Sequence, residues 1–256
     1  MILNYKDYGL QDSPAVFFLH GLLGCADNWG STSRVLSGEG LRCIAVDQRN
    51  HGSSPHSREM SYQLMADDLL RLADNLGLER FSIVGHSMGG KTAMETALRA
   101  PLRIKSLVVA DIAPIQYEPA YTDYISSLGK VSLEGMKSRS EAGRELEKFI
   151  PDRNLRMFFL TNLRKDESGN YRWRINIDGI TANYENIWKA IDDGRQYNGP
   201  VLFLRGDKSN FVQDKHFTLM RELFPAFDVR TIKDSGHWVH TEQPEVFRRL
   251  ISDFLP

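Results

Sequence analysis

Short apolar runs recur along the chain, each bounded by residues that favour turns. The runs contain few polar positions and do not alternate between apolar and polar side chains. Such continuous runs are typical of strands that are buried on both faces of a parallel sheet. The predicted strands are 15–19, 43–46, 81–84, 106–110, 201–204 and 229–232.

Amphipathic helices are predicted between these strands. In the clearest one, Ser61 is a candidate N-cap, an apolar stripe follows at helical spacing, and Gly77 ends the pattern. That stripe consists of Tyr62, Met65, Leu69, Leu72 and Leu76. A similar stripe near the end of the chain consists of Val246, Phe247, Leu250, Ile251 and Phe254. The alternation of strands and helices predicts an α/β fold with a doubly wound, mostly parallel sheet.

The alternation stops between residues 114 and 199. Three apolar stripes there have helical spacing, and the first follows Ser140, a candidate N-cap. The stripes are Leu146, Phe149 and Ile150; Leu155, Phe158, Phe159 and Leu163; and Tyr184, Ile187, Trp188 and Ile191. Residues 171–175 form one extended candidate. We expect a core domain of residues 1–113 and 200–256, with a small helical cap inserted at 114–199.

Composition limits the kinds of molecule that the protein is expected to bind. Of the 256 residues 41% are hydrophobic and 25% charged, and the formal net charge is −1, which are ordinary values for a globular protein. Without a basic patch we expect no nucleic acid partner, and without about 20 consecutive apolar residues we expect no membrane insertion. The expected protein is a cytoplasmic monomer or small homo-oligomer. Cys25 and Cys43 lack metal-site spacing, so we expect free thiols and no metal.

Residues 85–89 read Gly-His-Ser-Met-Gly between a predicted strand and a helical stretch. A serine on such a sharp bend is the nucleophile elbow of serine hydrolases. Side chains at positions 85 and 89 would clash with the bend, and glycine at both positions removes the clash. Ser87 is therefore the candidate nucleophile. The alternative is a plain glycine-rich turn, and the partners of Ser87 decide between the two.

Ligands bind open α/β sheets beyond the carboxyl ends of the strands, so the loops there supply the partners of Ser87. The loop at 20–24 reads His-Gly-Leu-Leu-Gly. We assign the backbone N–H groups of Leu22 and Met88 to an oxyanion hole, and His20 would brace the loop. His237 lies between the last predicted strand and the final helix, which is the place of the general base in hydrolases of this chain order.

These motifs together resemble the α/β-hydrolase superfamily, and within it the family of the bacterial esterase YbfF. The resemblance spans nearly the whole chain and is weakest between 114 and 199. It is carried by His20-Gly21, Asp47 to Ser54, Gly85 to Lys91, Asp111 to Pro114 and Gly236 to His240. The resemblance implies an esterase or thioesterase of acyl substrates with a small helical cap. Hydrolysis through an acyl-enzyme is expected to require no cofactor.

The acid of the expected triad has three candidates. Many relatives carry it after the penultimate strand in a Gly-x-x-Asp-x-x-Val pattern, but here Ser209 occupies that position and Asp207 comes two residues early. The other known place is the end of the strand after the nucleophile helix, where Asp111 lies. We assign Asp111, which would hold His237 in the productive tautomer, ahead of Asp207 and the more distant Asp178.

The expected reaction is hydrolysis of a carboxylic ester or thioester, such as an acyl ester or acyl-CoA, through an acyl-enzyme on Ser87. Leu23, His86 and Trp238 are expected to line an apolar substrate pocket. Serine at the elbow disfavours the dehalogenases and epoxide hydrolases of this fold, which use aspartate there. A carbon–carbon bond hydrolase, a peptidase or a haloperoxidase on the same scaffold, and a hydrolase-derived ligand receptor, remain as alternatives.

Overall fold

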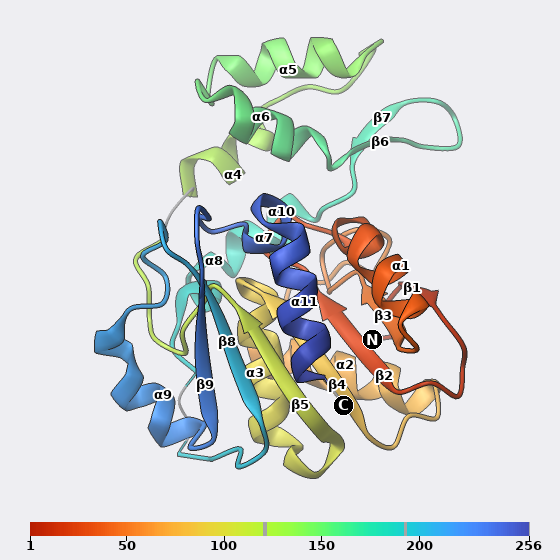
Figure 1. The fold of residues 1–256 in the computed structure, drawn as a ribbon. Helices are drawn as coiled ribbons and strands as arrows, with labels where there is room; N and C mark the ends of the chain where they lie inside the picture. The colour runs from red at the N-terminus through yellow and green to blue at the C-terminus, as the bar shows by residue number, and fades with distance from the viewer. Residues whose placement is uncertain (120–121, 192–193, 256) are drawn as a thin grey trace.

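The computed structural model describes residues 1–119, 122–191 and 194–255, and its central feature is a seven-stranded sheet (Figure 1). The strand order is β1-β3-β2-β4-β5-β8-β9. All neighbouring strands are parallel except β1 and β3. The strands are β1 Tyr5–Tyr8, β2 Ala15–Leu19, β3 Arg42–Val46, β4 Phe81–His86, β5 Ile104–Ala110, β8 Val201–Gly206 and β9 Phe227–Ile232. The predicted doubly wound, mostly parallel α/β fold is confirmed.

Each of the six predicted strands falls inside an observed strand, but the apolar pattern did not predict β1. This strand lies at the edge of the sheet and pairs antiparallel with β3, from Tyr5 opposite Val46 to Tyr8 opposite Cys43. Its side chains are largely exposed. An edge strand that faces solvent needs no continuous apolar run, so its sequence Tyr-Lys-Asp-Tyr carries no strand signal.

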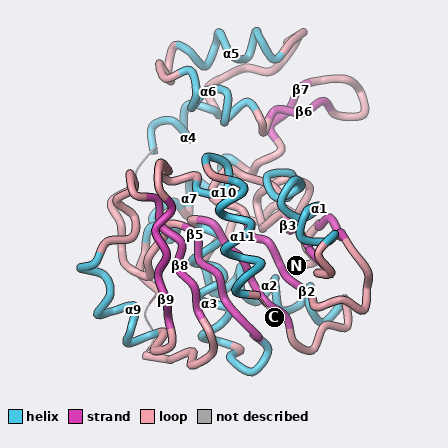
Figure 2. Tube along the Cα trace, in the orientation of Figure 1, coloured by secondary structure: helices cyan, strands magenta, loops and turns pink. Residues whose placement is uncertain are grey.

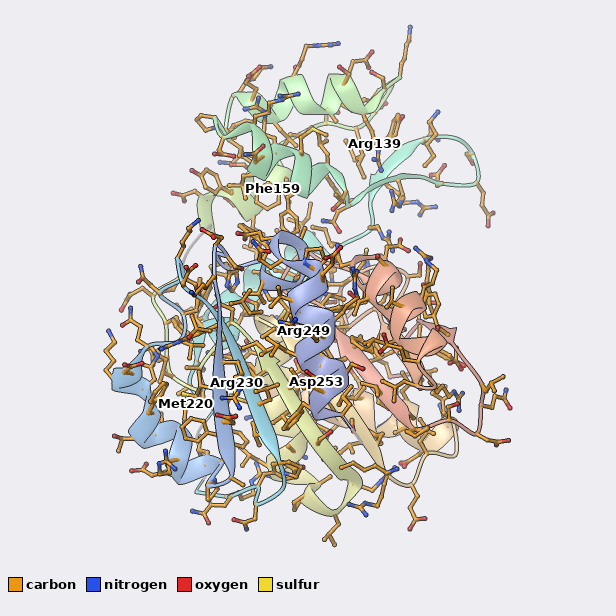
Figure 3. The ribbon with its side chains drawn as sticks, viewed as in Figure 1. Arg139, Phe159, Met220, Arg230, Arg249 and Asp253 are labelled. Carbon is orange, nitrogen blue, oxygen red and sulfur yellow. The ribbon has the colours of Figure 1, made fainter. Side chains whose placement is uncertain are left out.

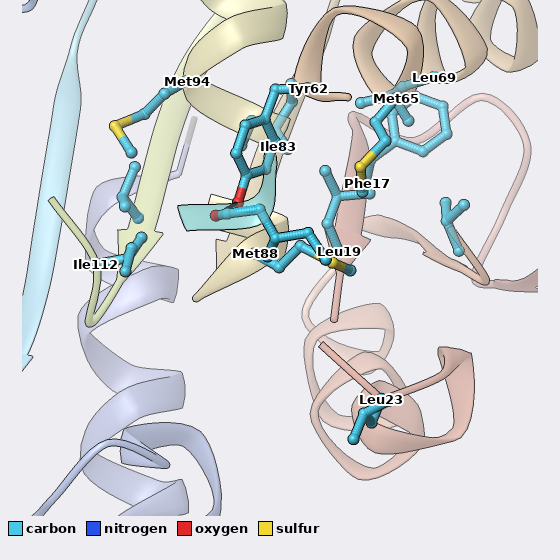
Figure 4. Packing of buried hydrophobic residues seen from close by; sticks show 14 of the residues in the cluster. Phe17, Leu19, Leu23, Tyr62, Met65, Leu69, Ile83, Met88, Met94 and Ile112 are labelled. Carbon is cyan, nitrogen blue, oxygen red and sulfur yellow. Dashed lines mark hydrogen bonds between the residues drawn. The ribbon is translucent and has the colours of Figure 1, made fainter. Parts of the chain in front are cut away.

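Helices cover both faces of the sheet (Figure 1). The helices α1 Gly30–Gly38 and α11 Pro244–Phe254 lie on one face, and α2 Tyr62–Asn75, α3 Met88–Arg99 and α9 Phe217–Leu223 lie on the other. Neighbouring strand residues point to opposite faces, so Phe18 packs in the cluster with α1 and α11, whereas Phe17 packs in the cluster with α2 and α3 (Figure 4). Short helices are η1 Ala26–Trp29, η2 Pro101–Arg103, η3 Asp214–His216 and α10 Val239–Glu242.

The ends of α2 follow the sequence signals. The Ser61 hydroxyl accepts a hydrogen bond from Leu64 N at 3.3 Å, which caps the first turn. Gly77 follows the helix with a φ of +67°, a conformation that glycine adopts without strain. Both predicted boundaries are confirmed.

Between β5 and β8, the described residues of 114–199 form short helices and one hairpin. The elements are α4 Thr122–Leu128, α5 Arg139–Glu147, α6 Arg153–Leu160, β6 Leu163–Lys165, β7 Tyr171–Trp173, α7 Ile177–Ala182 and α8 Tyr184–Trp188. The helices α4, α5 and α6 and the β6–β7 hairpin lie beyond the carboxyl ends of the sheet strands, whereas α7 and α8 lie closer to the sheet (Figures 1 and 2). Among the described residues, no helix is long and apolar enough to cross a membrane.

Two predicted details of this region are wrong. The N-cap of α5 is Ser138, whose hydroxyl accepts a hydrogen bond from Glu141 N at 3.2 Å, while Ser140 lies in the first turn. Leu163 does not extend the stripe of α6, because it begins β6 and pairs with Trp173. The extended candidate at 171–175 becomes β7, which ends at Trp173. Short apolar stripes do not distinguish the end of a helix from a following strand.

Candidate active site

Ser87 stands on a strained bend between β4 and α3. Its φ and ψ are 51° and −119°, a backbone conformation that residues with side chains rarely adopt. A Cβ on Gly85 would lie 2.2 Å from the Gly89 oxygen, and a Cβ on Gly89 would lie 2.3 Å from the Leu19 oxygen. Any side chain at position 85 or 89 would therefore clash with the backbone, as expected, and only glycine fits at both positions.

The sheet register brings Asp111 next to this bend. His86 pairs with Ala110, and Ala110 pairs with Leu204, so the residues that follow these strands share one edge of the sheet. Ser87 N donates to Ala110 O at 3.0 Å, and Asp111 N donates to Leu204 O at 2.7 Å. The loops of three parallel strands therefore meet at the carboxyl edge, as expected for an open α/β sheet.

His237 and Asp111 form a hydrogen-bonded pair. His237 Nδ1 lies 2.8 Å from Asp111 Oδ2, and the Asp111 side chain is fully buried. Gly206 N also donates to Asp111 Oδ1 at 3.1 Å, and the Ser209 hydroxyl donates to Oδ2. An ionised carboxylate is acceptor-only, so Nδ1 of His237 carries the proton and Nε2 is left as the acceptor in the neutral ring.

The other two acid candidates lie elsewhere. Asp207 is exposed, and its Oδ1 accepts a hydrogen bond from Ser235 N at 3.0 Å. The backbone hydrogen bonds from Ser235 and Asp234 lower the pKa of Asp207. Asp178 is exposed in the first turn of α7. Of the three candidates, the structure pairs Asp111 with His237.

The loop after β2 forms a turn that is held by two buried histidines. Gly24 N donates to Gly21 O at 2.9 Å, and the intervening Leu23 has a φ of +62°. Leu23 N donates to His51 Nε2 at 3.1 Å. His20 Nδ1 lies 2.8 Å from Gly21 O, and His20 Nε2 accepts from Gln48 N at 3.1 Å. The expected brace by His20 is present, and His51 adds a second one that the sequence did not identify.

Both histidines must be neutral to make these contacts. Each Nε2 accepts from a backbone N–H, so each Nδ1 carries the proton and donates to a carbonyl, which is Gly21 O for His20 and Arg49 O for His51. Burial lowers the pKa of His20, and burial lowers the pKa of His51 to about 3. The two rings are therefore fixed hydrogen-bonding groups at neutral pH.

The backbone N–H groups of Leu22 and Met88 are the expected oxyanion donors. Helix α3 begins at Met88, so its N–H is one of the first-turn groups that have no partner inside the helix. Leu22 lies beside Leu23 in the turn after β2, and a small cavity of about 20 Å³ is lined by Leu22, Ser87 and Met88 among others. Both residues thus line the same small cavity as Ser87.

His86 forms a hydrogen bond to the backbone of His237. Its Nε2 donates to the His237 oxygen at 2.8 Å, since that carbonyl can only accept. Burial lowers the pKa of His86 well below its ordinary value, so this ring is also neutral. On the other side, Phe211 stacks on the His237 ring with a centroid distance of 4.1 Å. Phe211 therefore packs against the His237 ring, while His86 holds the His237 backbone.

A cavity of about 900 Å³ opens over Ser87 and His237. Leu22, Leu23, His86 and Trp238 lie in its lining, together with Phe211 from the core. Region 114–199 contributes further apolar side chains, which are Ile125, Leu155, Phe158, Phe159 and Trp188. Phe159, labelled on α6 in Figure 3, is buried. A cavity of this size and lining suits a small molecule with an apolar part.

Lys91, one turn after Ser87 on α3, is a buried lysine within the elbow motif. Its Nζ donates to the carbonyl oxygens of Ile115, Trp188 and Lys189 at 2.9, 3.3 and 2.5 Å. The Tyr117 ring centroid lies 4.9 Å away, and burial lowers the pKa of Lys91 to about 7. Lys91 thereby ties helix α3 to the beginning of region 114–199 and to the end of α8 within it.

Metal-ligand clusters are not a feature of the described part of the chain. Within residues 1–119, 122–191 and 194–255, no group of three or more His, Cys, Asp or Glu side chains is arranged to hold a metal ion. Cys25 and Cys43 are both buried free thiols.

Fold and site together define the class, an α/β hydrolase with serine at the elbow. The sequence profile of the alpha/beta hydrolase fold matches residues 14–244. The chain belongs to the α/β-hydrolase fold family.

Similar proteins include enzymes from animals and bacteria. The chain is 38% identical to the mouse sn-1-specific diacylglycerol lipase ABHD11 over 97% of this chain and 84% of that protein. It is 33% identical to esterase YbfF of Escherichia coli over 96% of this chain and 94% of that protein, so the resemblance noted in the sequence is confirmed. A solved structure of a marine microorganism esterase superimposes with a TM-score of 0.94 at 39% identity and covers 99% of both chains.

Proposed function

We propose that this chain is a serine hydrolase that cleaves carboxylic esters, and that it acts on thioesters by the same chemistry. One observation carries the proposal: Ser87, on the strained elbow, opens into the same cavity as His237, whose Nδ1 lies 2.8 Å from the buried Asp111 carboxylate. The printed names of the mouse and Escherichia coli relatives, a lipase and an esterase, support ester hydrolysis.

The proposed reaction has two halves. In the first, Ser87 Oγ attacks the acyl carbonyl while His237 Nε2 takes the hydroxyl proton, and the same proton then leaves with the alcohol or thiol. In the second, a water molecule gives a proton to His237 and attacks the acyl-enzyme, and the acid is released when Ser87 recovers its proton. Asp111 stabilises the imidazolium without becoming protonated.

The oxyanion of each tetrahedral intermediate is stabilised, in this proposal, by the N–H groups of Leu22 and Met88. Removal of one such donor typically costs about 3–4 kcal/mol in other hydrolases. The positive end of α3 adds to this stabilisation because Met88 begins the helix. Leu23, His86 and Trp238 would contact the substrate, since they lie in the cavity lining.

Residues 114–199 form the cap of a core made of residues 1–113 and 200–256 in this proposal. Phe158 and Trp188 of this region line the cavity together with Trp238 of the core. The acyl chain would therefore lie between the two regions, and the cap would set its preferred length. The substrate class is a small-molecule acyl ester or thioester.

A fluorophosphonate probe tests the nucleophile. The wild type should be labelled at Ser87, and Ser87→Ala should lose both labelling and hydrolysis of p-nitrophenyl butyrate. A ligand receptor with an inert site would not react with the probe. A panel of p-nitrophenyl esters, acyl-CoAs and peptide substrates then separates esterase, thioesterase and peptidase activity. Full ester hydrolysis by Ser87→Ala would disprove the proposal.

A further inference from the structure

One side chain of region 114–199 reaches the loop of the proposed oxyanion hole. Asn162 lies between α6 and β6 and is 1% exposed. Its Nδ2 donates to the Leu23 carbonyl oxygen at 2.7 Å, although the two residues are 139 positions apart. The contact is a buried, directional hydrogen bond between the two regions that surround the cavity.

The turn that Asn162 contacts is strained. Leu23 has a φ of +62°, in the left-handed region that leucine rarely adopts. Leu22, the proposed oxyanion donor, is the residue next to it inside the same turn, which the Gly24 N to Gly21 O bond closes. A strained backbone of this kind persists only where its surroundings fix it. The direction of the Leu22 N–H therefore depends on how Leu23 is held.

Both backbone polar groups of Leu23 have side-chain partners. His51 from the core accepts from Leu23 N at 3.1 Å, and Asn162 donates to Leu23 O at 2.7 Å. Leu23 is itself buried, so water does not replace a lost partner easily. Without the Asn162 amide, only the bond from Gly24 N to Gly21 O would hold the peptide group after Leu23 in its strained orientation.

We propose that Asn162 is a positioning residue for the oxyanion hole, which couples the seating of region 114–199 to the geometry of the Leu22 N–H. This inference rests on the proposed hydrolase function. The segment that carries Asn162 continues directly from α6, whose Leu155, Phe158 and Phe159 line the cavity. When these apolar side chains pack over a substrate, Asn162 contacts Leu23 at the same time and so completes the oxyanion hole.

The hairpin that follows Asn162 has its own attachment to the core. Arg174 after β7 lies 3.5 Å from Asp27 and 3.9 Å from Asp47. Arg174 N also donates to the backbone oxygen of Asn162 at 2.8 Å, a contact that does not involve the Asn162 side chain. Substitution of the Asn162 side chain leaves these attachments in place, so its effect should fall on the turn at Leu23.

The test uses Asn162→Leu, which keeps the branched shape and removes the donor, and Asn162→Asp, which is nearly isosteric and opposes a carboxylate to the Leu23 oxygen. For both variants kcat should fall about tenfold, between the effect of one hydrogen bond and that of a whole oxyanion donor. The loss should be equal for p-nitrophenyl acetate and p-nitrophenyl octanoate, with KM changed by less than about twofold, because every acyl group forms the same oxyanion. Binding of a trifluoromethyl ketone transition-state analogue should weaken by the same factor.

Asn183→Leu is the matched control. Asn183 Nδ2 donates to Arg58 O at 2.6 Å, so it also joins region 114–199 to the core, but away from the turn at Leu23. Its kcat should stay at the wild-type value, and thermal melting should show that all three variants fold. The inference is overturned if both Asn162 variants keep the wild-type kcat, or if Asn183→Leu loses as much. Activity that survives Ser87→Ala would instead refute the hydrolase proposal itself.

Discussion

The loops that follow β5 and β8 each begin with an aspartate, and the two carboxylates lie in opposite environments. Asp111, directly after β5, is fully buried and has three donors around it, which are Gly206 N, Ser209 Oγ and His237 Nδ1. Asp207, directly after β8, is exposed and accepts from Ser235 N. A buried carboxylate needs such donors, whereas an exposed one is solvated by water.

In the proposed triad, the acid and its supporting donors come from the loops of neighbouring strands. The β5 loop supplies the carboxylate, and the β8 loop supplies two of its donors, the Gly206 N–H and the Ser209 hydroxyl. The parallel register, with Ala110 opposite Leu204, keeps the two loops together. Ser209 occupies the place where many relatives carry the acid, and it contacts the carboxylate that stands in for it.

Asp111→Asn should lower kcat more than any other substitution in these two loops. We expect kcat to fall by about 10³ to 10⁴, the cost of a lost triad aspartate in a known serine protease. An amide at this position neither stabilises the imidazolium nor selects the same His237 tautomer. The measurement is kcat for p-nitrophenyl butyrate, with fluorophosphonate labelling to show that Ser87 is still accessible.

Asp207→Asn is the matched control on the β8 loop. This carboxylate is exposed and accepts a hydrogen bond from Ser235 N. The kcat of the variant should therefore differ from the wild-type value by less than about twofold, since most surface substitutions have small effects. A severe loss in Asp207→Asn together with a mild one in Asp111→Asn would reverse the assignment of the acid.

An exchange of the two side chains gives an intermediate effect. In the double variant Asp111→Ser/Ser209→Asp, the carboxylate starts from the β8 loop and the hydroxyl from the β5 loop. We expect kcat to recover roughly tenfold relative to Asp111→Ser alone, since a carboxylate again faces His237 Nδ1. Ser209→Asp alone should destabilise the protein, because two carboxylates would then share one buried site. No recovery in the double variant would show that only the β5 geometry supports the acid.

The sequence was sufficient to predict the sheet and the elbow because both leave strong local patterns. Strands buried on two faces produce continuous apolar runs. The bend demands glycine at 85 and 89, because a Cβ at these positions would lie only 2.2 and 2.3 Å from a backbone oxygen. The fold's chain order then pointed to His237. The exposed edge strand β1 and the strand at Leu163 lack such signals, since each is defined by a pairing partner elsewhere in the chain. The N-cap of α5 at Ser138 is local, through Glu141 N, but the apolar stripe does not identify it.

The supports of the site were not predictable in the same way. His51 and Asn162 both hold Leu23, from 28 and 139 positions away, and neither lies in a local pattern that reveals its partner. Ser209 was visible only as a departure from the expected aspartate. Its hydrogen bond to Asp111 follows from the register of β5 and β8, which a single sequence does not contain.

Ser209→Ala should have a much smaller effect on kcat than loss of the Asp111 carboxylate, and it sharpens the division of roles between the two loops. Asp111 would keep its bonds to Gly206 N and His237 Nδ1, so the triad geometry should survive with kcat lowered by less than about tenfold. Loss of one hydrogen bond to a charged group should lower the free energy of unfolding by about 1.5–3 kcal/mol, measured by urea unfolding at neutral pH. A loss of kcat as large as that of Asp111→Asn would mean that the hydroxyl is as essential as the carboxylate, and the contrast between acid and support would disappear.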